Sequence, residues 1–450
     1  MYRLFLTVLA ALALSAHALQ AQQPQQPNPL AIPAPCRTAA DEALPELEKR
    51  KQRLEREVAQ TQDKIAAIKD ASREEARKAL QTTLRGSQEN LLKVVFQIEC
   101  ARAKAETSPE PVVASRSPAA KKADVVEVTT YYATNRNETA NSEPMKVYGV
   151  GRDLSMHYGK AVVTIPLTHV TGYLELPKLW KLQREPDSKK HFVLKSVVPM
   201  NLDSTRREMQ EKMVAGGSKA ILLFVHGYYL GFAEAAMRTA QLAHDLKFAG
   251  VPFFYSWPSA GTLLSYWQDE ETAELSEPLF EKLLDDLSLP PAADIYIVAH
   301  SMGNRIVSHA LKARVDQRKP TTHLREVLLA APDINAELFR TVIAPKLAEM
   351  QGTRTTIYAS SSDVALMASK IVHGFRRLGE TADGVFTYKG MDTIDASTAT
   401  QASRAYGHFY VMDNSLVLKD VRTIIDENRT AKDRGLNVIG KDPNIFYRLN

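Results

Sequence analysis

The stretch that decides the fold is Asp294-Ile-Tyr-Ile-Val-Ala-His-Ser-Met-Gly-Asn-Arg-Ile-Val307. Residues 295–299 form a short apolar run rich in β-branched and aromatic residues, which predicts a fully buried strand of the parallel type. From Met302 onward the apolar residues recur at helical spacing. Between the two patterns, Ala299-His-Ser-Met-Gly303 matches the nucleophile elbow G-x-S-x-G, with alanine in place of the first glycine. A serine before a helix is often only a cap, but one placed between a buried strand and a helix is predicted to be a nucleophile. We therefore assign that role to Ser301.

The rest of the C-terminal half alternates between strand and helix patterns. Repeated βαβ spacing predicts a mostly parallel sheet covered by helices on both faces, which is an α/β fold. The expected strands are residues 126–133, 158–165, 191–198, 220–225, 251–256, 294–299, 326–330, 355–359 and 385–388, and the expected helices include residues 233–248, 270–287 and 303–314.

A serine nucleophile needs a general base, and in an open parallel sheet this base comes from a loop at the carboxyl end of a strand. In an α/β-hydrolase the base follows the serine, which leaves His309, His323, His373 and His408. His309 lies two turns along the helix after Ser301, and His323 precedes a strand and so lies at the wrong edge. His408 follows the predicted strands in a Gly-His-Phe-Tyr loop and is the predicted base. His373 is the alternative, although it suits the end of a helix better.

Two aspartates compete for the role of the acid that orients the base. Asp363 follows the strand of residues 355–359, and Asp333 follows the strand before it. Both positions can place a carboxylate beside the base, so the choice is not forced. We favour Asp363, because Asp333 also suits a helix N-cap.

The oxyanion hole is expected where the strand of residues 221–225 runs into His226-Gly-Tyr-Tyr. Gly227 allows the chain to turn so that the N–H of Tyr228 faces the serine, and the second donor is the N–H of Met302. His226 is expected to hold this loop by hydrogen bonds and is not assigned to the triad. Clusters with metal-ligand spacing and glycine-rich phosphate loops are missing from the sequence, so no metal or nucleotide cofactor is expected.

Composition and the N-terminus bear on the cellular setting. The chain has 450 residues, 44% of them hydrophobic, and a net charge of +5, which is typical of a globular protein and does not favour nucleic acid as a partner. Residues 1–18 read as a signal peptide, with Arg3 in the n-region, an apolar run at 4–14 and the cleavage motif Ala16-His-Ala18. The apolar run is too short to span a membrane, so we expect no stable span. An exported protein, periplasmic or secreted, is predicted, with a flexible leader at residues 19–37.

Residues 38–104 carry two charged runs with apolar residues at alternating spacings of three and four. This pattern predicts an antiparallel α-helical hairpin with coiled-coil packing, which can mediate self-association or bind a partner. Ser72 and Glu75 form a capping box that begins the second helix. Cys36 and Cys100, the two cysteines of the chain, lie symmetrically about residue 68. In an oxidising compartment we expect them to form a disulfide.

A family resemblance adds to these inferences. The motifs that carry it are Phe224-Val-His-Gly-Tyr228, Ser256-Trp-Pro-Ser-Ala-Gly261, Ala299-His-Ser-Met-Gly-Asn304, Tyr358-Ala-Ser-Ser-Ser-Asp363 and Gly407-His-Phe-Tyr410, together with Tyr132-Ala-Thr-Asn-Arg136 and Gly159-Lys-Ala-Val-Val-Thr-Ile-Pro166. As a set the chain resembles a largely uncharacterised family of bacterial α/β-hydrolases in the esterase/lipase superfamily. The resemblance covers residues 125–420 and implies the α/β-hydrolase fold, a Ser301–Asp363–His408 triad and hydrolysis of an acyl ester. The helical hairpin and residues 178–195 lie outside the pattern.

The sequence therefore predicts a linker at residues 105–124 and an α/β-hydrolase domain at residues 125–450. The first functional hypothesis is an exported serine hydrolase that acts on a small-molecule or lipid ester. The aromatic segment 257–291 then either forms a wall or lid of an acyl pocket or packs as ordinary core. The same triad also suits an amide, because these motifs do not encode the leaving group. The alternative is a cell-envelope binding or assembly protein that works through its hairpin, with the hydrolase fold as a scaffold.

Overall fold

The computed structural model describes residues 44–67, single helical residues between 75 and 98, and residues 125–177, 186–261, 265–288, 293–401 and 407–449. The predicted signal peptide, leader and linker lie outside these ranges, as do Cys36 and Cys100. In the ranges that are described, no helix combines the length and the apolar character needed to cross a membrane.

Eleven strands in the described part of the chain form one sheet, in the order β10-β11-β9-β8-β7-β6-β4-β5-β1-β2-β3. The strands are β1 (Val125–Glu138), β2 (Tyr148–Pro166), β3 (Val193–Met200), β4 (Ala220–Val225), β5 (Val251–Ser256), β6 (Asp294–His300), β7 (Leu324–Ala330), β8 (Arg354–Ala359), β9 (Asp392–Asp395), β10 (Asn437–Ile439) and β11 (Phe446–Arg448). The pairs from β1 through β5, β4, β6, β7, β8 and β9 to β11 are parallel, and the outer pairs β1–β2, β2–β3 and β10–β11 are antiparallel. The mostly parallel sheet expected from the sequence is confirmed.

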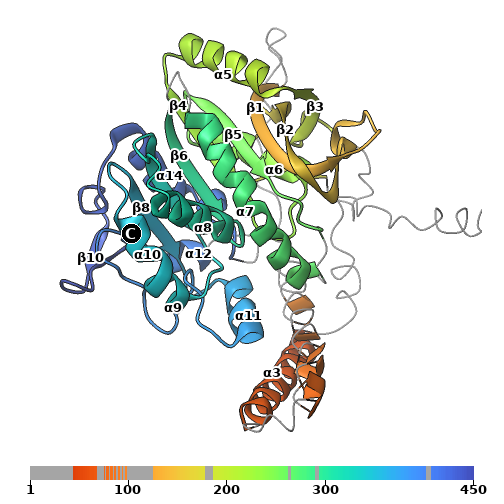
Figure 1. Ribbon diagram of the computed structural model, residues 1–450, viewed down its shortest axis with the longest axis vertical. Helices are drawn as coiled ribbons and strands as arrows, with labels where there is room; N and C mark the ends of the chain where they lie inside the picture. Colours follow the sequence, from red (N-terminus) through yellow and green to blue (C-terminus); the bar gives the residue numbers. More distant parts are fainter. Residues whose placement is uncertain are drawn as a thin grey trace, which may run out of the picture.

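Helices cover both faces of this sheet (Figure 1). The helices of the described residues are α3 (Leu44–Ala67), α5 (Leu202–Gly216), α6 (Phe232–Asp245), α7 (Tyr266–Ser288), α8 (Gly303–Asp316), α9 (Ala336–Leu338), α10 (Ala344–Ala348), α11 (Val364–His373), α12 (Ser397–Gln401), α13 (Tyr410–Asp413) and α14 (Ser415–Glu427), with the short 3-10 helices η3 (Pro144–Lys146) and η7 (Ala431–Asp433) and the π-helix η6 (Phe339–Ile343).

Alternation along β4 shows how one strand serves two cores. Its residues Leu223 and Val225 belong to the cluster that also holds side chains of α7 and α8, whereas Leu222 and Phe224 belong to the cluster that holds side chains of α6 and α14. Successive side chains of a strand point to opposite faces, so an unbroken apolar run is needed where both faces are covered. This explains why the central strands lack polar alternation.

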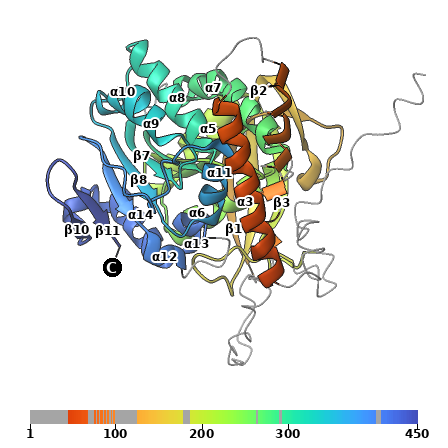
Figure 2. The same ribbon diagram turned by 90° about the horizontal axis from the view of Figure 1, so that it is seen from below.

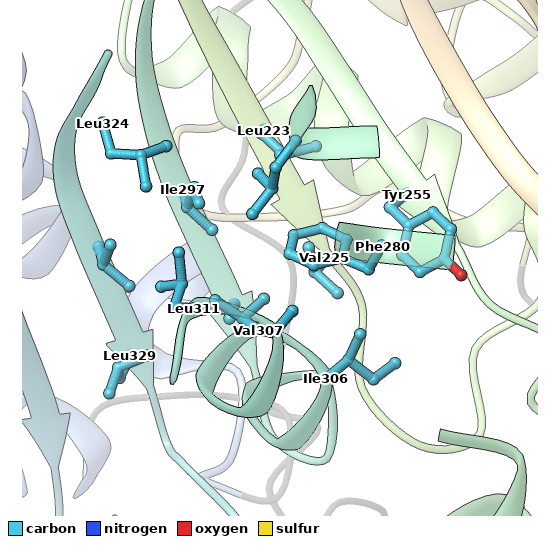
Figure 3. Close-up of a cluster of buried hydrophobic side chains, with 14 of the residues drawn as sticks. Leu223, Val225, Tyr255, Phe280, Ile297, Ile306, Val307, Leu311, Leu324 and Leu329 are labelled. Carbon is cyan, nitrogen blue, oxygen red and sulfur yellow. The ribbon is translucent and has the colours of Figure 1, made fainter. Parts of the chain in front are cut away.

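The first of these cores lies directly beneath the predicted nucleophile. Figure 3 shows Ile306, Val307 and Leu311 of α8 packed toward side chains of the central strands, among them Val225 and Ile297. Ile306, Val307 and Leu311 are fully buried. Their spacing places them on one face of α8, and this face fixes the helix against the sheet.

One expected strand is wrong. Residues 385–388 form no strand, and the place beside β8 is taken by β9, whose sequence is Asp-Thr-Ile-Asp. Phe386 is buried instead against Phe339, with the guanidinium of Arg340 over its ring. The apolar character of residues 385–388 therefore serves side-chain packing and not strand pairing. The two C-terminal strands β10 and β11 were also not expected, because each has only three residues.

Helix α3 lies apart from the sheet and near α11 (Figures 1 and 2). Pro45 stands in its first turn, where the missing N–H costs nothing. The described residues between 75 and 98 are helical, and several join α3 in a third apolar cluster. The buried members of that cluster are Leu47, Leu54, Leu91, Val94, Ile98 and, from α11, Ala368.

Candidate active site

The predicted site residues follow the carboxyl ends of neighbouring parallel strands. Strands β4, β6, β7 and β8 end at Val225, His300, Ala330 and Ala359, which lie within two residues of one another in the register of the sheet. The segments that follow these strands therefore start at the same edge. In open α/β sheets this edge is where ligands bind.

Ser301 occupies a strained turn between β6 and α8. Its φ is +53°, in the left-handed region that side chains other than glycine rarely adopt, and it is 6% exposed. The amide of Ser301 donates to the carbonyl of Ala330 (3.0 Å), and the Asn304 side chain donates to the carbonyls of Ser301 (2.8 Å) and Ala330 (3.1 Å). A Cβ at position 303 would lie 2.4 Å from the carbonyl oxygen of His226, so Gly303 is required for this close approach. These features match the nucleophile elbow expected from the sequence.

His408 and Asp363 are brought together. Nδ1 of His408 lies 2.8 Å from Oδ2 and 2.9 Å from Oδ1 of Asp363. Because a carboxylate only accepts hydrogen bonds, Nδ1 carries the proton and Nε2 is the nitrogen able to act as a base. Asp363 is also the N-cap of α11, where it accepts from the amide of Leu366 (3.0 Å). The cap holds the carboxylate in place.

The charge of the acid also tunes the base. Burial lowers the pKa of His408, but the attraction and the hydrogen bond of Asp363 outweigh burial and leave the pKa above its usual value of 6.5. The buried carboxylate of Asp363 thus favours the protonated form of His408.

His300, the residue before the nucleophile, was not assigned a role from the sequence. Its Nε2–H donates to the backbone carbonyl of His408 (3.0 Å), and its ring stacks on Phe409 at 4.5 Å between centroids. Burial holds the pKa of His300 well below the usual value, so the ring stays neutral. His300 therefore ties the loop of the base to the elbow. The sequence signal that could have revealed this role was the place of His300 between Ala299 and Ser301. A side chain at that position must face the loops above the neighbouring strand.

Asp333, the alternative acid, is engaged elsewhere. Its carboxylate accepts from Nε of Arg377 (2.6 Å), from the hydroxyl of Ser369 (2.6 Å) and from the hydroxyl of Tyr266. The N-cap role considered for it belongs to Asn335, which accepts from the first amides of α9. His408 is instead paired with Asp363.

The other histidines weighed as bases also have separate partners. His373, in the last turn of α11, lies 2.7 Å from Glu270 through Nε2 and 2.7 Å from the carbonyl of Ser369 through Nδ1. His309 pairs with Glu277 at 2.6 Å, and His323 precedes β7 at the opposite edge of the sheet.

The loop between β4 and α6 packs against the elbow. A Cβ at position 227 would lie 2.6 Å from the Cβ of Ser301, so only glycine fits there. Met302 is the N-cap of α8, where the first amides have no acceptor within the helix. Tyr228, the other predicted donor, follows Gly227 directly. The loop thus lies beside the nucleophile as an oxyanion hole requires.

His226 is a structural residue of this loop. Nδ1 lies 2.8 Å from the carbonyl of Gly227 and Nε2 lies 3.2 Å from the Ser256 hydroxyl, while the ring stacks on Trp257 at 5.2 Å. Burial, together with repulsion from Arg136, lowers the pKa of His226 to about 3.

The aromatic segment after β5 contributes mainly to the interior. Trp257 is fully buried and donates from its indole N–H to the carbonyl of His226 (2.7 Å), and Tyr266 is 6% exposed. Leu263 and Leu264 of the same segment lie outside the described residues.

In the described part of the chain, no three His, Cys, Asp or Glu side chains are grouped as metal ligands. The candidate residues supply a hydroxyl, an imidazole paired with a carboxylate, and backbone amides, which are the groups that acyl transfer requires.

A family match agrees with this fold. The family described as "Alpha/beta hydrolase of unknown function (DUF900)" matches residues 201–427. The uncharacterized protein alr1448 of Nostoc sp. (strain PCC 7120) is 37% identical over 73 residues, which are 16% of this chain and 19% of the Nostoc protein. Among solved structures, carboxyl esterase 2 of the mycorrhizal fungus Tuber melanosporum is similar at 12% identity with a TM-score of 0.26, over 66% of this chain and 87% of the esterase. The family match spans half of the chain, from α5 to the end of α14. The protein therefore belongs to the DUF900 family of α/β hydrolases of unknown function.

Proposed function

We propose that this α/β hydrolase is a serine hydrolase that cleaves carboxylic esters through Ser301, His408 and Asp363. The observation that carries the proposal is the pairing of His408 with Asp363 while Ser301 stands at positive φ on the elbow. A left-handed serine at the end of a buried strand costs free energy, and such strain is retained where the position of the hydroxyl has a use.

In the proposed mechanism, Nε2 of His408 takes the hydroxyl proton as Ser301 Oγ attacks the ester carbonyl. The imidazolium is stabilised by Asp363, and it then donates the proton to the leaving alcohol. Water, deprotonated by the same nitrogen, attacks the acyl-enzyme, and the acid leaves with Ser301 restored.

The negative charge that develops on the carbonyl oxygen is assigned to the amides of Tyr228 and Met302. Backbone donors are fixed by the fold before the reaction begins, so they stabilise the transition state without reorganisation.

A panel of p-nitrophenyl esters and matched p-nitroanilides, with acyl chains from two to sixteen carbons, tests the proposal. Wild type should hydrolyse at least one ester, and Ser301→Ala should lower kcat by about 10⁴-fold or more because the nucleophile is gone. Ser308→Ala is the matched control and should retain activity, since Ser308 is a buried serine within α8, beyond the elbow. Preferred cleavage of anilides would replace ester by amide as the substrate class, and full activity in Ser301→Ala would refute the proposed nucleophile.

We also propose, from the sequence alone, that the protein is exported and that Cys36 pairs with Cys100. Expression with a periplasmic fraction assay should give a mature chain that begins after residue 18 or 21. When this mature chain is treated with a thiol-alkylating reagent, its mass should rise by two alkyl groups, one on each cysteine, only if the disulfide is first reduced. An uncleaved chain in the cytoplasm would contradict export. Alkylation of the cysteines without prior reduction would contradict the disulfide.

A further inference from the structure

Arg136 has a fully buried guanidinium group outside the predicted triad. It lies near the end of β1 and is 1% exposed. Nε donates to the Ser256 hydroxyl (2.9 Å), and Nη2 donates to the carbonyl of Leu230 (2.9 Å). Nη1 donates to the carbonyls of Ser259 (3.1 Å) and Gly149 (3.2 Å). One side chain therefore joins the loop after β4 to the loop after β5.

Two acidic side chains reinforce the same two loops. Glu234, on α6, accepts from the amide of Gly231 (3.0 Å), and Asp269, on α7, accepts from the amide of Ala260 (2.8 Å). Burial lowers the pKa of Arg136 to about 10, against the attraction of Asp269 and Glu234, so the group remains charged at neutral pH. A buried cation is costly unless its donors are hydrogen-bonded and nearby groups offset its charge. Arg136 donates to four acceptors, and Asp269 and Glu234 attract it.

The loop held in this way carries a strained residue beside the predicted oxyanion donor. Tyr229 has a φ of +73°, and its amide donates to the Ser259 hydroxyl (2.9 Å), which in turn donates to Asp269 (2.5 Å). Since Tyr229 is fixed, the neighbouring peptide that bears the Tyr228 amide is constrained as well. At the other side of that peptide, Gly227 abuts Ser301.

We propose that Arg136 is a positioning residue that holds residues 226–231 in the geometry in which the Tyr228 amide binds the developing oxyanion. The inference rests on the proposed serine-hydrolase function and deepens it. Arg136 acts through its hydrogen bonds to the carbonyls of Leu230 and Ser259 and does not itself touch the substrate. The five donors of a guanidinium can serve four acceptors in a plane, which the single ammonium of lysine cannot do.

The test compares Arg136→Gln and Arg136→Lys with wild type on an ester that wild type hydrolyses. Loss of an oxyanion donor acts in the transition state, so Arg136→Gln should lower kcat by about 10- to 100-fold and leave KM nearly unchanged. The inhibition constant of a trifluoromethyl ketone, which forms a tetrahedral adduct with the serine, should rise by the same factor as kcat/KM falls. The acid limb of the pH–rate profile should not move, because His408 keeps its partner Asp363. Arg136→Lys should restore part of the lost kcat.

Arg314→Gln separates this role from a general loss of stability. Arg314 is a buried arginine at the far end of α8, where it donates to the carbonyl of Pro320 (2.8 Å) and pairs with Asp285 (2.5 Å). This variant should lower the melting temperature while kcat stays at the wild-type value. If Arg136→Gln does not fold, Arg136→Lys decides: its kcat should still be at least several-fold lower than that of wild type.

Two results would overturn the positioning role and leave the serine mechanism intact. One is a wild-type kcat in the folded Arg136 variants. The other is an Arg314→Gln variant that melts at the same temperature as Arg136→Gln and loses as much kcat. A wild type that neither hydrolyses esters nor binds the ketone would instead refute the proposed function, and the inference with it.

Discussion

At the scale of single residues, the site depends on two backbone conformations that cost free energy. Ser301 and Tyr229 both have positive φ, and each such non-glycine residue costs on the order of 1–3 kcal/mol. Both are held by hydrogen bonds from their surroundings: Asn304 binds the carbonyl of Ser301, and Ser259 accepts from the amide of Tyr229. Strain of this kind persists only where neighbouring groups determine the geometry, which is expected of a preorganised site.

The pH dependence of hydrolysis follows from His408. The base must be neutral to accept the serine proton, so activity should be lost as the pH falls through the pKa of His408. Asp363 leaves that pKa above 6.5 in spite of burial, so the half-maximal rate of the acid limb should lie above pH 6.5. The neighbouring His300 stays neutral and His226 has a pKa of about 3, so neither should add a step in this range. A profile of kcat/KM between pH 5 and 9 checks this, and an acid limb centred below pH 6 would contradict it.

The sequence predicted the serine and the base because the order of the chain and the edges of the sheet excluded the other candidates. It could not decide between Asp363 and Asp333, since both follow adjacent parallel strands. The contacts that distinguish them involve side chains distant in sequence: Asp333 binds Arg377 and Ser369, whereas Asp363 binds His408. The role proposed for Arg136 was not predicted from the sequence for a similar reason, because its hydrogen-bond acceptors lie up to 123 residues away along the chain.

At the scale of elements, α11 links the acid to the fold. Asp363 caps the helix and binds His408 with the same carboxylate, so its two roles can be separated by substitution. Asp363→Asn keeps a good N-cap but removes the charge and the proper acceptor. It should lower kcat by up to about 10⁴-fold while stability changes by less than about 1 kcal/mol.

Asp333→Asn is the matched control for that substitution. It leaves the buried guanidinium of Arg377 without its carboxylate, so it should lower the free energy of unfolding by roughly 3–5 kcal/mol. Activity of the folded fraction should persist. Chemical denaturation and steady-state kinetics of both variants check this, and the opposite pattern would make Asp333 the acid.

Elements with a strong pattern were predictable, and short ones were not. Strands β4, β5 and β6 have apolar runs that burial on both faces demands, and their bounds agree with the prediction to within one residue. Strand β9 is only four residues long and begins and ends with aspartate, whereas the apolar residues 385–388 pack without pairing. A side chain buried in a loop and one buried in a strand look alike in sequence.

At the scale of the whole molecule, the N-terminal helices pack against the helix that begins with the predicted acid. Ala368 of α11 is 2% exposed within the cluster that contains Leu47, Leu54 and Leu91. The contact is apolar and small, and the triad residues themselves come from loops at the carboxyl edge of the sheet. The helices should therefore be able to loosen without loss of the catalytic geometry.

Leu54→Ala tests this arrangement. Removal of a buried leucine costs about 2–5 kcal/mol, and this loss should fall on the helix pair and not on the hydrolase fold. Limited proteolysis should therefore cleave residues 44–98 at least about tenfold faster than in wild type, while ester hydrolysis stays unchanged. Arg53→Ala, at the exposed neighbouring position of α3, is the control and should behave as wild type. Equal cleavage of all three proteins would show that the cluster does not stabilise the pair.

The central claim is that Ser301 is an activated nucleophile, and intact-mass analysis after incubation with a fluorophosphonate tests it most directly. Wild type should gain the mass of a single phosphonyl group, since the reagent needs both a deprotonated serine oxygen and an oxyanion hole. Ser301→Ala should gain none under the same conditions. An unlabelled wild type whose circular dichroism and melting curve show it to be folded would contradict the serine mechanism, and so would an adduct of equal yield on Ser301→Ala.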